Sequence, residues 1–260
     1  MKNPIGIIDS GVGGLSVAST LFRSYPKESF IYIADSKNCP YGQKSEQEIY
    51  DLTRKMVDFL MEKEIKLLVV ACNTITVTAI DKLRKDYPII PIVGIVPVLK
   101  TAATSSISKK IGVFSTKVTS ESQYQRDLIN RFARNCVVVS VGSSDLVGMI
   151  ENLDFDSIDR VLERELNEFR INQVDVLALG CSHFPLIKDR IAKKLPNVLI
   201  LDSSGAVSRQ VGRILKANNS YSKKSNSSYN FYTTGDIEKL KFFAEKLTIN
   251  PRVERISLHD

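Results

Sequence analysis

The sequence predicts an α/β protein built from two similar domains, each with a parallel sheet. Strand-like apolar segments alternate with segments of helical periodicity along nearly the whole chain, which is typical of parallel α/β folds. Four of the strand-like segments recur in the same order at nearly constant spacing, which indicates a repeated unit. The two domains are therefore expected to be related by pseudo-symmetry.

The first half has four apolar segments with the character of buried strands. They span residues 4–8, 30–34, 67–71 and 89–95. Helical periodicity over residues 15–22 predicts a first helix. Ser45 and Glu48 form a capping-box sequence, which predicts that a second helix begins there, and a third helix is expected to end near Tyr87.

The second half repeats this order at offsets of 106 to 109 positions. Its strand-like segments are residues 111–116, 136–141, 174–180 and 198–201. A helix is predicted over residues 203–216, and the tail has strand, helix and strand patterns at 229–234, 237–247 and 252–258. This tail is too small to fold alone. We therefore expect a discontinuous first domain, residues 1–97 with 208–260, and an inserted second domain, residues 98–207.

Composition places the chain among ordinary globular proteins. Apolar residues make up 43% and charged residues 25%, no apolar run is long enough to span a membrane, and the N-terminus lacks a signal-peptide hydrophobic segment. We therefore expect a cytoplasmic protein with no membrane partner. The net charge of +7 is interpreted as a solvated surface or as steering of an anionic substrate. Basic stripes with interleaved aromatics are missing, so no nucleic-acid partner is expected.

The cysteine and histidine content excludes several kinds of site. Four cysteines without close pairs do not form a disulfide framework, and the spacings typical of metal ligands are absent. His183 and His259 are the only histidines, which nearly excludes a histidine-built metal site. We expect no metal.

Polar and reactive side chains follow the predicted strands at the point where each strand ends. They are Asp9 with Ser10, Asp35 with Ser36, Cys72 with Asn73 and Thr74, Ser115 with Thr116, and Cys181 with Ser182 and His183. Ligands of parallel α/β sheets bind outside the carboxyl ends of the strands. If the two halves face each other, all of these residues line one cleft, and we expect the active site in the cleft between the domains.

Two of the four cysteines occupy equivalent positions in the two halves. Cys72 follows an apolar run and precedes two helix-capping residues, and Cys181 follows another run ahead of a helix begun by Pro185. A helix N-terminus favours the thiolate form of cysteine. A single buried cysteine is usually a small core residue, but two cysteines placed alike in repeated halves favour a functional pair. Cys39 and Cys136 lack this context and are interpreted as structural.

Two thiols facing one cleft are compatible with three kinds of chemistry. A redox disulfide usually uses a CxxC pair, which is absent, and nucleophilic attack would leave one thiol idle. In two-base proton transfer, each thiol removes a proton from one face of a carbon and the other returns it. Inversion of a stereocentre has two nearly mirror-related transition states, so a nearly symmetric pair of bases favours this third chemistry.

Shorter motifs in the first half supply further candidates. Residues 9–14 form a glycine-rich turn whose backbone amides can approach an anion. Asp9 precedes these glycines and is suited to orienting an ammonium group or to exchanging a proton with a thiol. Tyr41 and Gly42 belong to a Pro-Tyr-Gly segment, which is either an ordinary turn or a loop that binds a carboxylate.

The second half has its own candidates beside the thiol. His183 lies two residues after Cys181 and is interpreted either as a structural histidine or as a proton partner of that thiol. Glu151 has little local support, so the sequence alone favours a solvated glutamate. Thr116 and Thr119 begin a predicted helix and are candidates for its caps.

Taken together, these motifs resemble the glutamate racemases, cofactor-independent enzymes that supply D-glutamate for bacterial cell-wall peptidoglycan. Each motif alone is only weakly specific, whereas the ordered set covers nearly the whole chain. The matching segments are residues 9–16 (DSGVGGLS), 40–42 (PYG), 70–74 (VACNT), 91–94 (PIVG) and 180–185 (GCSHFP), with weaker matches at 116–119 and 233–236.

The resemblance implies specific roles for these residues. It makes Cys72 and Cys181 the two acid/bases, with Cys72 on the D-glutamate side and Cys181 on the L-glutamate side. It makes Asp9 and His183 their respective proton partners, and Glu151 a further catalytic candidate. It places substrate binding on Asp9, Ser10, Tyr41, Gly42, Asn73, Thr74, Thr116, Ser182 and His183. It implies glutamate as substrate, no cofactor such as pyridoxal phosphate, no metal, and a homodimer.

The sequence departs from the usual family pattern in three places. Ser182 and Phe184 stand where threonine and tyrosine are usual, Ser115 stands where glycine is usual, and residues 75–77 are bulkier than usual. Two alternative functions remain open at this point. One is a racemase of the same superfamily that acts on aspartate or another amino acid, and the other is a non-catalytic protein that binds an amino acid or a partner.

Overall fold

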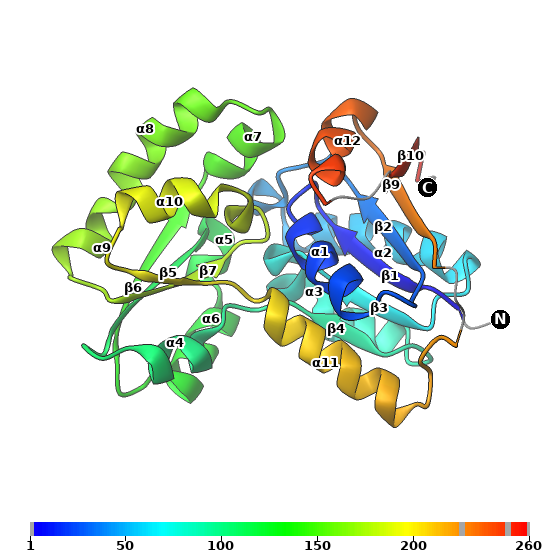
Figure 1. The fold of residues 1–260 in the computed structure, drawn as a ribbon, viewed down its shortest axis with the longest axis horizontal. Helices are drawn as coiled ribbons and strands as arrows, with labels where there is room; N and C mark the ends of the chain where they lie inside the picture. Colours follow the sequence, from blue (N-terminus) through cyan, green and yellow to red (C-terminus); the bar gives the residue numbers. More distant parts are fainter. Residues whose placement is uncertain (1–2, 224–226, 248–250, 259–260) are drawn as a thin grey trace. The chain divides into compact units, whose positions relative to one another are not determined.

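The computed structural model describes residues 3–223, 227–247 and 251–258. Its chain forms two compact units, each of which is described by itself. Unit 1 comprises Met1–Ile95 and Ser204–Asp260, and unit 2 comprises Val96–Ser203. The boundaries expected from the sequence, after residues 97 and 207, lie a few positions further along the chain. Figure 1 labels the helices and strands.

Unit 1 contains a sheet of six strands whose neighbours are all parallel. The strands are β1 (Ile5–Asp9), β2 (Phe30–Ala34), β3 (Leu67–Val70), β4 (Ile92–Gly94), β9 (Tyr229–Thr233) and β10 (Arg252–Arg255). They lie in the order β10-β9-β2-β1-β3-β4, so strands from the C-terminal tail extend the sheet beyond β2. Strand β4 is shorter than the predicted segment 89–95, since only its last part pairs with β3.

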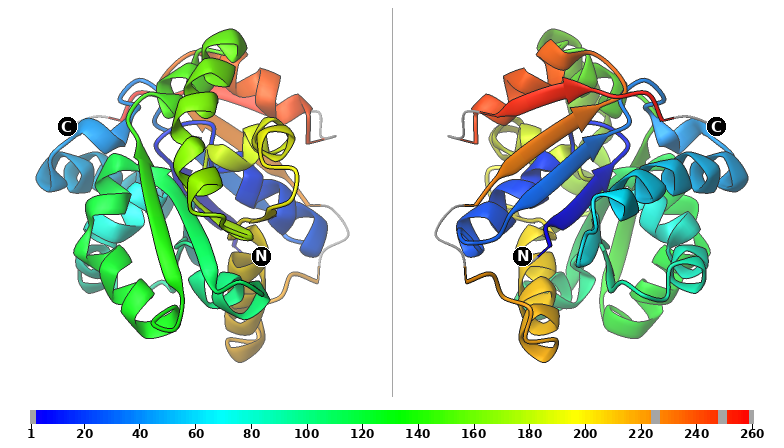
Figure 2. Two further views of the ribbon diagram at one scale, coloured as in Figure 1. Left: turned by 90° about the vertical axis from the view of Figure 1, so that its left-hand side faces the viewer. Right: turned by 90° about the vertical axis from the view of Figure 1, so that its right-hand side faces the viewer.

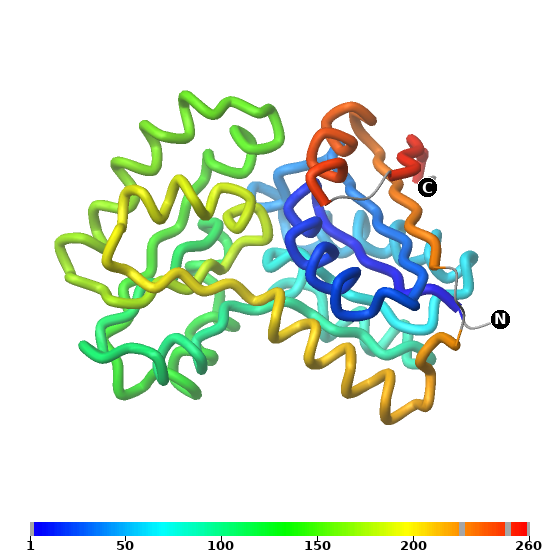
Figure 3. The backbone as a smooth tube through the Cα atoms, viewed as in Figure 1, coloured from blue at the N-terminus to red at the C-terminus, as the bar shows by residue number. Residues whose placement is uncertain are grey.

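Helices connect these strands and cover the sheet. They are α1 (Leu15–Ser24), α2 (Glu46–Glu62), α3 (Asn73–Asp86), α11 (Ser204–Ala217) and α12 (Ile237–Glu245), together with the 3-10 turn η1 (Tyr41–Gln43). The predicted capping box starts α2: the Glu48 backbone N–H donates to Ser45 Oγ, and the Ser45 backbone N–H donates to the Glu48 carboxylate. Helix α1 packs against α11, and the backbone trace in Figure 3 shows the two side by side.

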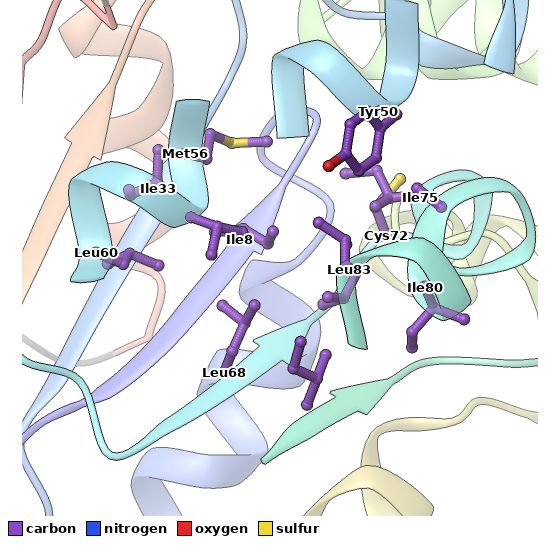
Figure 4. Packing of buried hydrophobic residues seen from close by; sticks show 14 of the residues in the cluster. Ile8, Ile33, Tyr50, Met56, Leu60, Leu68, Cys72, Ile75, Ile80 and Leu83 are labelled. Carbon is purple, nitrogen blue, oxygen red and sulfur yellow. The ribbon is translucent and has the colours of Figure 1, made fainter. Parts of the chain in front are cut away.

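The central strands of unit 1 end level with one another. Every residue of β1, β2 and β3 is buried, as expected for strands covered on both faces. Asp9 pairs with Ala34, and Ile8 pairs with Val70, so the carboxyl ends of all three strands reach the same edge of the sheet. Their apolar side chains form a core with α2 and α3, and Figure 4 shows Cys72 among the residues of this core.

Unit 2 contains a smaller sheet of four strands, again with every neighbouring pair parallel. Its strands are β5 (Lys110–Thr116), β6 (Val137–Ser143), β7 (Val176–Gly180) and β8 (Leu199–Leu201). Its helices are α4 (Leu99–Ser105), α5 (Lys117–Glu121), α6 (Gln123–Phe132), α7 (Leu146–Glu151), α8 (Phe155–Glu165), α9 (Asn167–Ile171) and α10 (Lys188–Lys194), with the 3-10 turn η2 (Phe184–Ile187).

The two sheets share one topology, which confirms the predicted fold class. Unit 2 has the strand order β6-β5-β7-β8, and unit 1 has the corresponding order β2-β1-β3-β4 at the centre of its sheet. Each repeated segment of the sequence occupies the same place in its own sheet. Unit 1 differs by the two additional strands β9 and β10. No helix in the described part of the chain is both long and apolar enough to cross a membrane.

Candidate active site

The thiol of unit 1 lies where β3 passes into α3. Cys72 follows the buried strand by two residues, and its side chain is 4% exposed. Its Sγ lies 3.5 Å from Oγ of Ser10, which follows the end of the neighbouring strand β1. We refer to Asp9, Ser10, Cys72 and Asn73 as the thiol edge of unit 1. The sequence repeat therefore places a thiol beside a hydroxyl at the carboxyl edge of this sheet.

The helix after Cys72 begins one residue earlier than its capping sequence predicts. Cys72 itself is the N-cap, in extended conformation and without a side-chain capping hydrogen bond, so the expectation that Asn73 or Thr74 caps the helix was wrong. The physical reason is that the Cys72 carbonyl already accepts from the Thr76 backbone N–H at 3.0 Å and from Thr76 Oγ1 at 2.9 Å. Asn73 and Thr74 therefore stand inside the first turn.

The side chain of Asn73 is buried without satisfying its hydrogen-bonding capacity. It is 2% exposed, and neither its amide nitrogen nor its amide oxygen has a hydrogen-bond partner among the residues that the structure describes. A buried amide in this condition costs roughly 1–3 kcal/mol of stability. An amide that offers both a donor and an acceptor beside a thiol suits a ligand that carries both carboxylate and ammonium groups.

The glycine-rich turn after β1 fixes Asp9 at the same edge. The Gly11 backbone N–H donates to Asp9 Oδ1 at 2.8 Å, and the Tyr32 hydroxyl donates to the Gly11 carbonyl at 2.7 Å. Gly14 has no space for a side chain, because a Cβ there would lie 2.8 Å from Asp9 Cβ and 2.9 Å from Ala71 Cβ. The glycine therefore lets the first turn of α1 pack directly against the strand ends that carry Asp9 and Cys72.

The Tyr41 hydroxyl forms a hydrogen bond within the protein. It donates to Asp35 Oδ2 at 2.5 Å, and its ring is buried. Burial raises the pKa of Tyr41 well above its usual range, and the negative charge of Asp35 acts in the same direction. The phenol is thus held as a neutral donor to Asp35. Within the Pro-Tyr-Gly segment this leaves the backbone of Tyr41 and Gly42 as the groups available to a carboxylate.

Asp35 lies beside Tyr41, although the sequence predicts only that it follows the end of a strand. Its carboxylate also accepts from Thr234 Oγ1 at 2.6 Å and from the Asn38 side-chain amide. Burial raises its pKa, although the hydrogen bonds from Thr234, Tyr41 and Asn38 act in the opposite direction. The signal in the sequence was the Asp-Ser pair at the end of β2, which matches Asp9-Ser10 at the end of β1.

Unit 2 carries its thiol at the matching edge. Cys181 follows the last residue of β7 and is 3% exposed. Gly180 pairs with Ser115 of the neighbouring strand β5, and a Cβ at this glycine would lie 2.9 Å from Ser115 Cβ. The glycine therefore allows close approach of the two strands just before the thiol. Thr116 is the N-cap of α5 and accepts from the Thr119 backbone N–H, as the sequence predicts.

His183 is held by a carboxylate from another part of unit 2. Its Nε2 lies 2.6 Å from Glu151 Oε1, and its Nδ1 lies 3.4 Å from Ser182 Oγ. Glu151 is the last residue of α7 and is 7% exposed, so its interpretation from sequence alone as a solvated glutamate was wrong. The burial arises because α7 brings this residue against the strand-to-helix turn after β7. We refer to Cys181, Ser182, His183 and Glu151 as the thiol edge of unit 2.

The other two cysteines have no comparable position. Cys136 precedes β6 and thus stands at the amino end of its strand, away from the edge that carries Cys181. Cys39 lies in the loop between β2 and η1 and is partly exposed. Within either unit taken alone, the described residues contain no group of three His, Cys, Asp or Glu ligands close enough to share one metal ion.

Comparison with known proteins identifies the family. The sequence profile of the Asp/Glu/Hydantoin racemases matches residues 5–211 of this chain. The chain belongs to this family. A glutamate racemase of Pseudomonas putida is 38% identical over 241 residues, which cover 92% of this chain and 91% of the relative. The resemblance to the glutamate racemases that the motifs indicate is therefore confirmed.

Solved structures of this racemase family agree with the fold. The glutamate racemase isoform RacE1 of Bacillus anthracis has a TM-score of 0.90 and 32% identity, with 99% of each chain covered. The glutamate racemase of Francisella tularensis, solved in complex with D-glutamate, has a TM-score of 0.84 and 30% identity, with 99% of this chain and 98% of that chain covered.

Proposed function

We propose that this chain interconverts L-glutamate and D-glutamate by two-base proton transfer at Cα. The observation that carries the proposal is the placement of one thiol at the same edge of each repeated sheet. Cys72 follows the strand beside β1, and Cys181 follows the strand beside β5. Support for glutamate comes from relatives named glutamate racemase and from the Francisella tularensis relative in complex with D-glutamate.

The proposed reaction balances without a cofactor. For D-glutamate, the Cys72 thiolate takes the Cα proton, and the Cys181 thiol gives a proton to the opposite face of the carbanion. One C–H bond and one S–H bond break, and one of each forms. The two thiols exchange protonation states during a turnover, and the reverse reaction uses the same atoms in the opposite order. Protons must then redistribute before the next turnover in the same direction.

Neighbouring groups support the two thiols in different ways. Ser10 Oγ lies 3.5 Å from the sulfur of Cys72. The neighbouring residue Asp9 is fixed at the same edge of the sheet by its hydrogen bond within the glycine-rich turn. On the other unit, the carboxylate of Glu151 is paired with His183, two residues after Cys181. We assign Asp9 and His183 as the proton partners of Cys72 and Cys181, respectively. A carboxylate on one side and a histidine on the other make the two half-reactions chemically unequal.

The proposed substrate contacts follow from donors and acceptors near each thiol. Helix α3 presents its N-terminus beside Cys72, which suits a carboxylate, and the amide of Asn73 can bind the substrate directly. Further contacts are assigned to Asp9, Ser10, Thr74, Thr116, Ser182, His183 and the backbone of Tyr41 and Gly42. We further propose that the protein acts in the cytoplasm as a homodimer, and that its product enters peptidoglycan synthesis.

Thiol variants test the two-base mechanism. Cys72→Ala and Cys181→Ala are each expected to abolish racemisation of glutamate by purified protein without added cofactor. Cys136→Ala removes a thiol at the amino end of a strand and is the matched control, with activity close to that of the unmodified protein. Near-normal turnover in either single active-site variant would refute the mechanism.

Deuterium exchange tests the substrate. In deuterium oxide, the unmodified protein is expected to incorporate deuterium at Cα of glutamate as it racemises it, and to leave aspartate unlabelled. Incorporation of deuterium into aspartate but not into glutamate would refute glutamate as the substrate. It would still be compatible with the two-thiol chemistry. Absence of exchange into either amino acid would favour a binding protein.

A further inference from the structure

Unit 1 contains a pocket at the carboxyl edge of its sheet, lateral to the thiol edge. Its volume is about 420 Å³, within the usual range for small-molecule sites. It lies at the ends of β2, β9 and β10, three neighbouring strands of which β9 and β10 come from the C-terminal tail. The right panel of Figure 2 shows these strands side by side in blue, orange and red. The thiol edge of unit 1 follows β1 and β3 instead, and Tyr41 and Gly42, which follow β2, do not line the pocket.

The charged residues that line this pocket are predominantly cationic. Lys37, Lys55 and Arg255 contribute to it, against a single carboxylate, Asp35. Lys37 and Arg255 are exposed and form no ion pair within the described ranges of the chain. Both side chains line the pocket and are exposed to solvent, so their positive charges attract an anion.

The one carboxylate in the pocket is already engaged by donors from the protein. Asp35 is fully buried, and both of its oxygens accept hydrogen bonds, from Thr234 and Asn38 on one and from Tyr41 and Asn38 on the other. These donors compensate much of its negative charge. The Thr234 hydroxyl, which also accepts from the Lys37 backbone N–H, fixes the loop that carries this lysine.

Part of the pocket wall is apolar, and the polar side chain of Ser257 also belongs to it. Leu52, Ile256 and Leu258 line it beside the cationic residues. Inorganic phosphate would use only the charged part of such a site. A ligand that joins an anionic group to a hydrocarbon or aromatic body would use both.

We propose that this pocket is a binding site for a small organic anion, in which a phosphate or carboxylate group pairs with Lys37 and Arg255. The body of the ligand contacts Leu52 and Ile256. The site is distinct from the substrate contacts proposed above, and binding can be measured without any catalytic activity.

Calorimetric titration with phenyl phosphate tests the site in the full chain at low ionic strength. We expect one molecule to bind per chain, and inorganic phosphate and benzyl alcohol each to bind at least about fivefold more weakly. The double variant Lys37→Ala/Arg255→Ala is expected to weaken binding by about tenfold or more. All four substituted side chains in this variant and its control are exposed, so both proteins are expected to fold.

The control variant separates a built site from a general charge effect. Lys27→Ala/Arg134→Ala removes the same net charge from exposed positions outside the pocket and is expected to leave binding unchanged. Equal weakening in both double variants would overturn the proposal, as would absence of binding up to about 10 mM. Displacement of phenyl phosphate by saturating D-glutamate would place the probe at the substrate site and would also overturn it.

Discussion

His183 Nε2 lies 2.6 Å from Glu151 Oε1, and both side chains are buried. A carboxylate at this distance fixes the orientation of the imidazole ring and stabilises its protonated form. The ring then presents Nδ1 toward Ser182, whose Oγ lies 3.4 Å away. The pair connects the end of α7 to the turn that carries Cys181.

Replacement of Glu151 by glutamine should impair the half-reaction that uses Cys181. Glutamine keeps the shape of the side chain but removes the charge that stabilises the imidazolium. We expect kcat/KM to fall by about tenfold. The fall must be equal in the two directions, because the equilibrium constant between enantiomers is one. Coupled racemisation assays started from each enantiomer provide the measurement.

Isotope effects locate the impaired step. With Glu151→Gln, proton removal from L-glutamate by Cys181 becomes more rate-limiting, so the deuterium isotope effect with 2-deuterio-L-glutamate should rise more than that with the D-enantiomer. The exposed residue Glu168 provides the control, and Glu168→Gln should change neither quantity. Equal isotope effects from both enantiomers would contradict the assignment of His183 and Glu151 to the Cys181 side.

Much of the fold could be predicted because its determinants are local. The buried strands β1, β2 and β3 are unbroken apolar runs, and the Ser45–Glu48 capping box marks the start of α2 in the sequence itself. The repeated order of segments predicted two halves of similar topology, and the common strand order of the two sheets agrees with it. Short elements such as β4 were predicted less well, since their bounds depend on pairing with a neighbouring strand.

The burial and hydrogen-bond partners of some site residues could not be predicted from the local sequence pattern, because they depend on the folded conformation. Glu151 is buried beside His183 of the turn after β7, and its own neighbours in sequence do not show this contact. The hydrogen bond from the Tyr41 hydroxyl to Asp35 is a similar case. The two residues are six positions apart in a loop, and the conformation of that loop, which has no regular pattern, brings them together. The thiols were found because their positions in the strands repeat.

The buried amide of Asn73 predicts a conflict between stability and substrate binding. Asn73→Leu replaces an unpartnered amide by an apolar group of similar size, so the free energy of unfolding should stay unchanged or rise by about 1 kcal/mol. The same change should raise the KM for glutamate by about tenfold or more. Urea unfolding and steady-state kinetics on one preparation test both parts.

Thr76 in the same helix provides the contrast for Asn73. It is equally buried, but its hydroxyl donates to the Cys72 carbonyl and accepts from the Ile95 backbone N–H. Thr76→Val should therefore lower the free energy of unfolding by about 1–3 kcal/mol. A comparable loss of stability in Asn73→Leu would show that the Asn73 amide is satisfied in the folded protein.

The Tyr41 hydroxyl is predicted to stabilise the fold and to contribute little to substrate binding. Tyr41→Phe removes a hydrogen-bond donor from the buried Asp35 carboxylate. The free energy of unfolding should therefore fall by about 1–3 kcal/mol. The KM for glutamate should change by less than about threefold. Tyr87→Phe, which removes a donor from the exposed Asp58, should cost less stability. A hundredfold loss of kcat/KM at full stability would instead assign the phenol to the substrate.

Asp175 should make the stability of unit 2 depend on pH in the acid range. Its carboxylate accepts from Ser106 Oγ and from two backbone N–H groups, and these donors outweigh the effect of burial and lower its pKa to about 2. Because this pKa lies below the unfolded value of 3.8, the stabilisation is fully present above about pH 4 and is lost as the pH falls toward 2.

Urea unfolding of Asp175→Asn across this range tests the prediction. Near neutral pH the variant should be less stable than the unmodified protein by about 1 kcal/mol, a value reduced by solvent screening of this half-buried group. The difference should shrink as the pH falls below 4 and become small near pH 2, where the Asp175 carboxyl of the folded protein is about half protonated. Asp81→Asn, at a position whose side chain is 80% exposed, is the control and should show little difference at either pH. A difference as large at pH 2 as near neutral pH would mean that the charge of the Asp175 carboxylate does not stabilise its contacts with residues 106–108.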